Sequence, residues 1–216
     1  MGPRSGGQGG EHLDIWVVVM TLEEILKSRE ARVARQRELL EANPGLSLIS
    51  LTVQPPGPVK RNDASLVIAR AGVEAVRKAF KVEYEELRDL DTGFEGFFLV
   101  NMDPLETKHL TCRIEDTHPL GRLMDLDVIV LAGAAVELRP YSAAASGAKR
   151  EWTRQGSSGC PAETTVAPIG REELGLGPRK CLLCDRPARE CMRARTHSIE
   201  ELLDNIQTLV NSYLNL

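Results

Sequence analysis

The sequence predicts an α+β fold in which a mixed or antiparallel sheet is flanked by helices. Helix-start signals precede apolar periodic segments near both ends of the chain. Between them lie several short segments with the length and composition of β-strands. The 216 residues are 42% apolar and 27% charged, so the chain is large enough to bury a hydrophobic core.

Three segments are expected to be helices. The sequence TLEE at 21–24 is a capping box, and the helix that it starts is expected to run to about residue 42. Asp63 is the expected cap of a second helix over 64–80. The sequence SIEE at 198–201 is another capping box, and apolar residues at helical spacing follow it as the expected buried stripe: Leu202, Ile206, Leu209 and Tyr213.

Runs of β-favouring residues bounded by turn residues mark the strands. The strand candidates are the segments 46–53, 82–90, 94–100, 109–115 and 125–131. One of them lies between the first two predicted helices, and the others follow the second helix.

Composition divides the chain into four parts. Residues 1–19 begin with a glycine-rich stretch and are expected to be a disordered extension. Residues 20–132 form the main α+β domain, and the Ala, Gly and Ser-rich residues 133–168 form a low-complexity insertion loop. Residues 169–216 contain a Cys/His-rich basic segment and the terminal helix, which are expected to pack on the same domain.

Charge and cysteine content exclude several classes of protein. The net charge of −4 argues against bulk nucleic-acid binding, and no apolar run approaches the roughly 20 residues of a membrane span. An odd number of cysteines, five, argues against a disulfide framework. We therefore expect a cytoplasmic protein with reduced thiols.

The first predicted helix has an interrupted apolar stripe. Positions 22, 26, 29, 33, 36 and 40 share one face, and four of them are aliphatic. Arg29 and Gln36 occupy the other two, and Arg32 lies beside the stripe. These three side chains could donate hydrogen bonds to a phosphate-rich ligand. The alternative is that Arg29 pairs with an internal carboxylate or extends into solvent.

Asp125 and Asp127 form the second candidate site. Residues two apart on a strand project from the same face, so the two carboxylates would lie together and could hold Mg²⁺. An acid pair exposed to solvent is the alternative explanation. Glu115 could be a third ligand if the 109–115 strand pairs with the 125–131 strand. The loop before Asp125 contains His118, either a proton acceptor or a structural residue, and Arg122.

The third candidate site is a compact set of soft metal ligands. Cys181, Cys184, Cys191 and His197 lie within 17 residues, which suits a tetrahedral Zn²⁺ site, although small thiols packing a loop would look similar. Basic residues surround them, with a local charge of +4 over 19 residues (six basic minus two acidic), and they include Arg179 and Lys180. Such a patch suits phosphate, pyrophosphate or an acidic protein partner.

These segments together resemble one protein family, the citrate lyase holo-acyl-carrier-protein synthases (CitX). The resemblance covers most of residues 20–132 and 169–210. It rests on TLEEIL at 21–26, REARVARQ at 29–36, PGPVK at 56–60, HPLGRLMDLDV at 118–128, and RKCLLC at 179–184 with Cys191 and His197.

The resemblance implies a nucleotidyltransferase-like fold and an enzymatic activity. The enzyme would transfer the phosphoribosyl-dephospho-CoA group from triphosphoribosyl-dephospho-CoA to a serine of the acyl carrier (gamma) subunit of citrate lyase and release pyrophosphate. Asp125 and Asp127 would hold Mg²⁺, with His118 and Arg122 beside them. The donor would be bound by basic and amide side chains: Arg29, Arg32, Gln36, Lys60, Arg179 and Lys180.

Two other functions remain open at this point. One is the equivalent transferase for the malonate decarboxylase carrier protein. The other is a non-catalytic, zinc-containing module that binds phosphate or nucleic acid. An aromatic content of 4% leaves few side chains for base stacking, so no nucleic-acid partner is expected.

Overall fold

The fold is described from a computed structural model, which describes residues 20–132 and 165–216. The expectations for residues 1–19 and 133–164 lie outside the described residues. The helices and strands run in chain order as α1 Leu22–Ala42, β1 Ser47–Val53, α2 Asp63–Ala79, β2 Val82–Leu90, β3 Gly93–Val100, α3 Pro104–Thr117, β4 Asp125–Ala132, β5 Thr165–Pro168, α4 Ala188–Ala194 and α5 Ile199–Leu214, with short 3₁₀ helices at Gly121–Leu123 and Arg171–Leu174.

The five strands form one sheet in the order β2-β3-β1-β4-β5, and every neighbouring pair is antiparallel. The predicted α+β class is therefore confirmed, with an antiparallel rather than a mixed sheet. The register aligns Thr52 on the central strand β1 with Glu95 on β3 and Asp125 on β4. Two residues earlier, Ser50 lies between Phe97 and Asp127.

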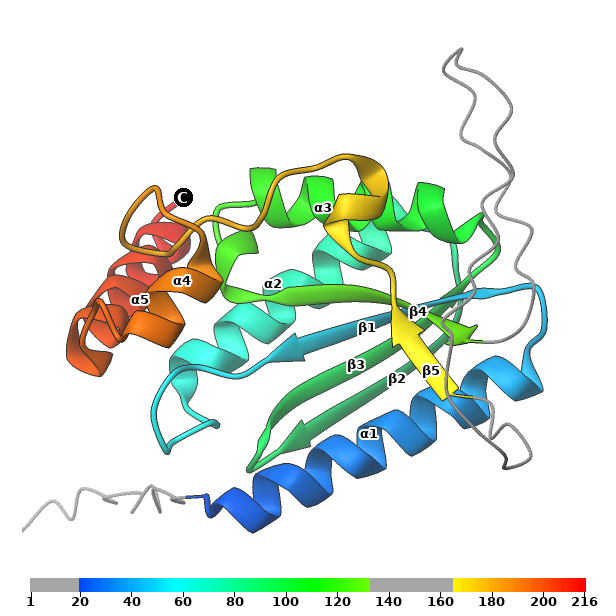
Figure 1. Cartoon of the computed structure of the whole chain (residues 1–216), viewed down its shortest axis with the longest axis horizontal. Helices are drawn as coiled ribbons and strands as arrows, with labels where there is room; N and C mark the ends of the chain where they lie inside the picture. Colours follow the sequence, from blue (N-terminus) through cyan, green and yellow to red (C-terminus); the bar gives the residue numbers. More distant parts are fainter. Residues whose placement is uncertain (1–19, 133–164) are drawn as a thin grey trace, which may run out of the picture.

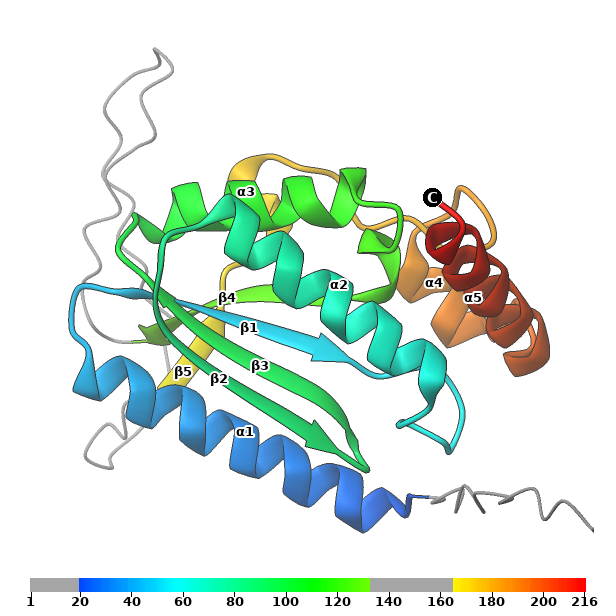
Figure 2. The same cartoon turned by 180° about the vertical axis from the view of Figure 1, so that it is seen from behind.

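The sheet has helices on both faces (Figures 1 and 2). Helix α1 covers one face, where Leu39 and Leu40 pack on a small cluster of strand residues that includes Leu48, Phe97 and Ile129. The larger core lies on the opposite face, between the sheet and helices α2, α3 and α5. None of the helices in the two described stretches is both long and apolar enough to cross a membrane.

Helix capping follows the sequence closely. The predicted boxes are present at both ends of the chain, where Thr21 pairs with Glu24 and Ser198 with Glu201. For α2 the predicted cap is wrong by one residue. Asn62, not Asp63, is the extended residue whose side chain accepts from the backbone N–H of Ser65.

The segment 109–115 was expected to be a strand, and this prediction is wrong. Its apolar residues alternate, but it lies in the middle of α3. Asp103 caps this helix by accepting from the backbone N–H groups of Leu105 and Glu106, and Pro104 occupies the first turn, where its missing N–H costs nothing. This start signal outweighs the short alternating pattern.

The predicted buried stripe of α1 is also wrong for most of its length. Leu22, Leu26 and Val33 are 73%, 47% and 50% exposed. The face turned toward the sheet carries Gln36, a polar position of that stripe, and Arg32, which lies beside it. Only Gln36 and Leu40 of the predicted stripe are buried.

The end of the expected insertion loop at 133–168 is a strand. Residues 165–168 form β5, which pairs with the second half of β4 from Ile129 to Ala132. The first half of β4, which contains Asp125 and Asp127, is consequently not paired with β5.

Candidate functional site

Polar side chains gather at one end of the sheet face that α1 covers. We call this set, Ser50, Thr52, Glu95, Asp125 and Asp127, the polar patch. All five alternate with core residues along β1, β3 and β4, and the register aligns them in two adjacent rows. The next row consists of Leu48, Leu99 and Ile129, so this face changes from polar to apolar within one strand length.

Two donors of α1 lie over the polar patch. The amide of Gln36 donates to the hydroxyl of Ser50 at 2.9 Å, and both residues are buried. The guanidinium of Arg32 donates to the Glu95 carboxylate at 3.1 Å. Burial raises the pKa of Glu95, while Arg32 and Arg88 oppose this shift. Thus α1 presents Arg32 and Gln36 to the sheet, whereas Leu26 and Val33 of the predicted stripe are exposed.

Asp127 lies beside a buried lysine. Lys108, on α3, is 3% exposed, and its ammonium is 3.6 Å from an oxygen of Asp127 and 3.3 Å from the carbonyl oxygen of Leu126. Desolvation raises the pKa of Asp127, and the charge of Lys108 acts against it. The Asp127 side chain is still half exposed, so a ligand can reach its carboxylate.

Asp125 is held by the C-terminal segment. The guanidinium of Arg179 pairs with the Asp125 carboxylate and also donates to the carbonyl oxygens of Gly121, at 2.9 Å, and Met124, at 2.6 Å. Gly121 lets this loop approach α3, because a Cβ here would be only 2.5 Å from the carbonyl oxygen of Glu115. The loop, the strand and the Cys/His-rich segment therefore meet at Asp125.

Glu115 is not positioned as the sequence suggested. It lies on α3, where one carboxylate oxygen accepts from the backbone N–H of Leu126 at 2.9 Å and the other is 3.4 Å from Arg171. Lys108 donates to the carbonyl oxygen of the same Leu126. Glu115 and Lys108 together therefore satisfy the backbone N–H and C=O of Leu126, in the part of β4 that β5 does not pair with. Burial raises the pKa of Glu115. This carboxylate completes the sheet edge, and both of its oxygens already have partners there.

His118 ends α3 and stabilises the following turn. Its Nδ1 accepts from the backbone N–H of Leu120 at 3.0 Å, and its ring packs at 5.6 Å from the ring of Tyr213. Burial lowers the pKa of His118, which favours the neutral ring. These contacts agree with the structural alternative for His118.

Arg29, in the N-terminal half of α1, lies near Lys60, which follows the turn after β1. The Lys60 ammonium donates to the carbonyl oxygen of Pro55 at 2.8 Å. Its pKa is lowered by burial first and by the charge of Arg29 second. Arg29 itself is exposed. Lys180, also exposed, forms an ion pair with Asp185 at 3.1 Å.

The four predicted zinc ligands come together, and we call them the Cys/His cluster. The thiols of Cys181, Cys184 and Cys191 and a ring nitrogen of His197 all lie within 4.8 Å of one another. Within residues 20–132 and 165–216, this is the one set of three or more His, Cys, Asp or Glu side chains placed closely enough to hold a metal ion. The Cys184 sulfur is 3.5 Å from that of Cys191 and 3.4 Å from Nε2 of His197. A backbone hydrogen bond of 2.7 Å, from the N–H of Cys181 to the carbonyl oxygen of Arg186, closes the loop that carries the first two thiols.

The Cys/His cluster is physically connected to the polar patch. Arg122, in the loop before β4, donates to the carbonyl oxygens of Lys180 and Cys181. Arg179 immediately precedes these two residues and pairs with Asp125. Two guanidinium groups therefore hold the segment of the Cys/His cluster against the strand that carries the aspartates.

The thiols of the Cys/His cluster differ in acidity. The pKa of Cys184 is lowered to about 6, first by a backbone hydrogen bond from Arg186 and then by His197. Desolvation raises the pKa of Cys191 to about 11. The thiolate is the form that binds metals, so Cys184 is better prepared to do so than Cys191.

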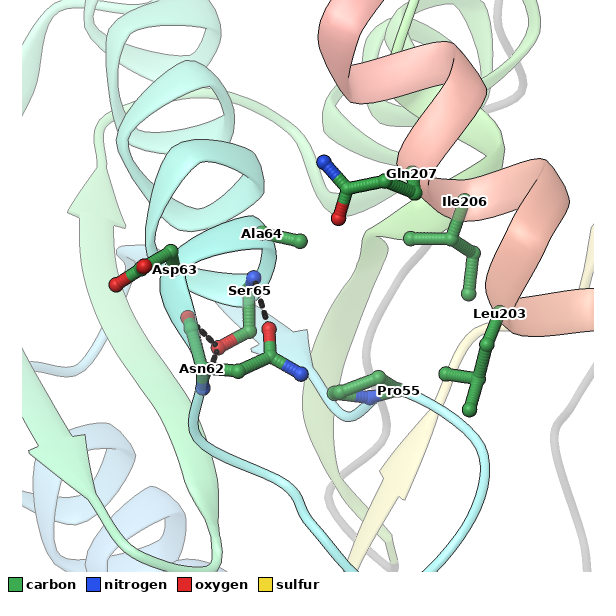
Figure 3. Close-up of a pocket in the computed structure, with 8 residues that line it drawn as sticks. All are labelled: Pro55, Asn62, Asp63, Ala64, Ser65, Leu203, Ile206 and Gln207. Carbon is green, nitrogen blue, oxygen red and sulfur yellow. Dashed lines mark hydrogen bonds between the residues drawn. The ribbon is translucent and has the colours of Figure 1, made fainter. Parts of the chain in front are cut away.

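Two cavities lie beside α5. The larger, of about 930 Å³, is bounded by the turn after β1, the start of β4, the Cys/His cluster and α5, and both Asp125 and Arg122 line it. We call it the large cavity. The smaller, of about 280 Å³, lies between α5 and the start of α2 (Figure 3). There Asn62 and Ser65 hydrogen-bond to each other as the cap of α2, so the Oδ1 of Asn62 and the hydroxyl of Ser65 already have partners.

Sequence reasoning missed several residues of the site. Lys108 and Glu95 are buried and charged, but nothing in their local sequence marks them, because their burial depends on how α3 and β3 are placed. Ser50 had a detectable signal, since it is a polar residue within the apolar strand 46–53. Arg179 was predicted as a donor-binding residue, and its pairing with Asp125 was not foreseen.

Comparison with known proteins gives a consistent result. A family model described as CitX, apo-citrate lyase phosphoribosyl-dephospho-CoA transferase, matches residues 20–143 and 162–213. A probable apo-citrate lyase phosphoribosyl-dephospho-CoA transferase of Streptococcus pyogenes serotype M18 is 32% identical over 197 residues, covering 90% of this chain and 87% of the relative. The apo-citrate lyase phosphoribosyl-dephospho-CoA transferase of Escherichia coli O157:H7 is 29% identical over 197 residues, covering 89% of each.

Proposed function

The chain belongs to the apo-citrate lyase phosphoribosyl-dephospho-CoA transferase family. From this premise we propose that the phosphoribosyl-dephospho-CoA group is transferred at the polar patch. The observation that carries the proposal is the position of Asp125 and Asp127. Both carboxylates project from the same face of β4, and each lies beside a basic side chain, Arg179 or Lys108. Such an arrangement suits a reaction in which negative charge must be positioned and neutralised.

The proposed reaction forms one phosphodiester bond. A serine hydroxyl of the carrier subunit attacks the phosphorus next to the ribose of triphosphoribosyl-dephospho-CoA, the hydroxyl loses its proton, and pyrophosphate leaves. This is nucleotidyltransferase-like chemistry, in which the protein mainly aligns the groups and stabilises charge. We propose a nucleotidyltransferase-like role for the two aspartates on this basis.

Mg²⁺ fits the two aspartates. Hard oxygen ligands suit this ion, which is commonly held by one or two carboxylates together with substrate phosphates. Asp125 and Asp127 would hold it, and its charge would neutralise the departing pyrophosphate. The positive charges of Arg179 and Lys108 offset the repulsion between the two neighbouring carboxylates.

Basic and amide groups would bind the rest of the triphosphate. Arg32 and Gln36 project from α1 toward the polar patch, and Arg122 lies beside Asp125 in the large cavity. Arg29 and Lys60 extend this set of donors toward the N-terminal half of α1. Lys180 is exposed on the loop after Arg179, where it can meet an approaching anionic partner.

Zn²⁺ fits the Cys/His cluster. A tetrahedral site with bonds of about 2.3 Å places its ligand atoms roughly 3.8 Å apart, which agrees with separations of 3.4 and 3.5 Å within the cluster. With four protein ligands the ion would be structural and would fix the loop that carries Arg179. The exposed arginines around it, Arg186, Arg189 and Arg193, would dock an acidic carrier subunit.

The test is mass spectrometry of the carrier subunit after incubation with the purified chain, triphosphoribosyl-dephospho-CoA and Mg²⁺. We expect the mass to rise by one phosphoribosyl-dephospho-CoA group and pyrophosphate to appear in equal amount. A carrier whose serine is replaced by alanine is the control and should stay unmodified. Because the family and the relatives are named for citrate lyase, its carrier should react faster than that of malonate decarboxylase.

A further inference from the structure

The large cavity is mostly apolar, although it begins at a charged site. Asp125 and Arg122 line it where it adjoins β4. The Cys/His cluster forms part of its wall, and much of the remaining lining is made of aliphatic side chains that come from separate parts of the chain: Val53, Ile68, Leu123, Leu182, Leu202 and Ile206. A volume of about 930 Å³ is within the range of small-molecule sites, which is roughly 300–1,000 Å³.

Apolar surface continues from the large cavity into solvent. Met192, on α4, is 72% exposed, and Ile199, at the start of α5, is 47% exposed, and both line the cavity. Exposed apolar side chains that adjoin a cavity are typical of ligand-binding grooves. The groove therefore offers apolar contacts along its length to a ligand whose reacting end lies at Asp125.

Arg195 adds a positive charge to the same cavity. Within the described parts of the chain, Arg195 is the one non-glycine residue whose backbone φ is positive, at 47°. This position ends α4, where glycine adopts the left-handed conformation at lower cost. In the same described parts, its guanidinium has no hydrogen-bond or ion-pair partner. An arginine here thus keeps an unpaired donor at the cavity, in a backbone conformation that favours glycine.

We propose that the large cavity binds the dephospho-CoA portion of the donor, an inference that rests on the proposed function. The long, largely apolar pantetheine arm would lie along the aliphatic walls, and Arg195 would pair with the diphosphate. The reacting phosphorus would then be at Asp125, because the same cavity ends there. Binding energy from the non-reacting arm would position the triphosphate for transfer.

The test uses dephospho-CoA alone and measures its binding to the full chain by titration calorimetry. We expect one molecule per chain and tighter binding than for ADP, which lacks the pantetheine arm. Ala188→Trp should fill the cavity that Ala188 lines and weaken dephospho-CoA binding at least about tenfold. Ala194→Trp, at an exposed position of the same helix, is the matched control and should bind normally.

Arg195→Gly is the second variant, and it decides the test if Ala188→Trp does not fold. It should weaken dephospho-CoA binding about tenfold while the midpoint of thermal unfolding stays equal or rises. Arg113→Ala removes the same charge at an exposed position of α3 outside the cavity and should bind normally. Absence of binding to the wild type, or wild-type binding by the folded Ala188→Trp variant, overturns the inference; if that variant does not fold, normal binding by Arg195→Gly overturns it.

Failure of this inference is distinguishable from failure of the proposed function. Asp127 does not line the large cavity, so Asp127→Asn should lose transfer and still bind dephospho-CoA. If Asp127→Asn retains transfer while the cavity variants lose binding, the transfer site is wrong and the cavity assignment stands. If the cavity variants bind normally while Asp127→Asn loses transfer, the cavity assignment alone is wrong.

Discussion

The guanidinium of Arg179 pairs with the carboxylate of Asp125, although the two residues are 54 positions apart in the sequence. The same guanidinium donates to the carbonyl oxygens of Gly121 and Met124, so it fixes both the loop and the first residue of β4. Arg122 makes the reciprocal connection by donating to the carbonyl oxygens at positions 180 and 181. Two arginines thus join the Cys/His cluster to the polar patch.

Replacing Arg179 should impair transfer more than folding. Arg179→Met removes the charge beside Asp125 and the donors to two carbonyl oxygens, and we expect turnover to fall about 100-fold. Arg179→Lys keeps the charge and loses the planar fork of donors, so it should recover only part of the turnover. Carrier modification and thermal unfolding are measured together, and full turnover in Arg179→Met would contradict the positioning role.

Removing either carboxylate charge should abolish transfer. Asp125→Asn and Asp127→Asn each remove a proposed Mg²⁺ ligand at nearly constant size, and we expect turnover at least about 1,000-fold lower with wild-type circular dichroism. Asp185→Asn is the control, because Asp185 is 96% exposed and its ion pair is with the exposed Lys180. If both site variants keep their turnover, the metal and the chemistry lie elsewhere.

The sequence predicted the frame of the fold because that frame depends on local signals. Capping boxes at Thr21 and Ser198 and alternating strands such as 125–131 are encoded within a few residues. The face of α1 that would be buried was not predictable in this way. The N-terminal part of α1 packs on the polar patch and not on apolar side chains. Arg32 and Gln36 therefore contact the sheet, and Leu26 is exposed to solvent.

The candidate site was predictable where its residues are close in sequence. Asp125 and Asp127, and the four members of the Cys/His cluster, each form a short motif. Glu115 was misjudged because its role depends on α3 lying along the free edge of β4, where it accepts from the Leu126 N–H. Lys108 was missed for the same reason.

The Cys/His cluster should contain about one zinc ion per chain by elemental analysis. Cys184→Ser or His197→Ala should lower the zinc content below half an equivalent, since each removes one of four ligands. Because the cluster is joined to Asp125 through Arg179, the loss of zinc should also lower turnover. Cys112→Ala, a buried thiol outside the cluster, is the control and should keep its zinc. A zinc-free wild type that transfers the group would exclude this structural role.

Glu86 should make the stability of the protein depend on pH between about 4.5 and 2. Although desolvation acts in the opposite direction, hydrogen bonds from Arg35, Tyr84 and Arg88 lower the pKa of Glu86 from 4.5 to about 2. A carboxyl whose pKa is lower in the folded state stabilises that state above its unfolded pKa, and this contribution is lost as the pH falls toward 2. At neutral pH the ionised carboxylate therefore holds β2 against α1 through Arg35.

Glu86→Gln should accordingly reduce the free energy of unfolding by about 1–3 kcal/mol at pH 7, as measured with urea. The difference between variant and wild type should shrink when the same titration is repeated at pH 3. Glu83→Gln is the matched control, because Glu83 pairs with Lys81, which is 90% exposed, and such a surface pair contributes little. A Glu86→Gln effect of the same size at both pH values would contradict the ionised Glu86–Arg35 pair, since the missing stability would then not depend on the carboxylate charge.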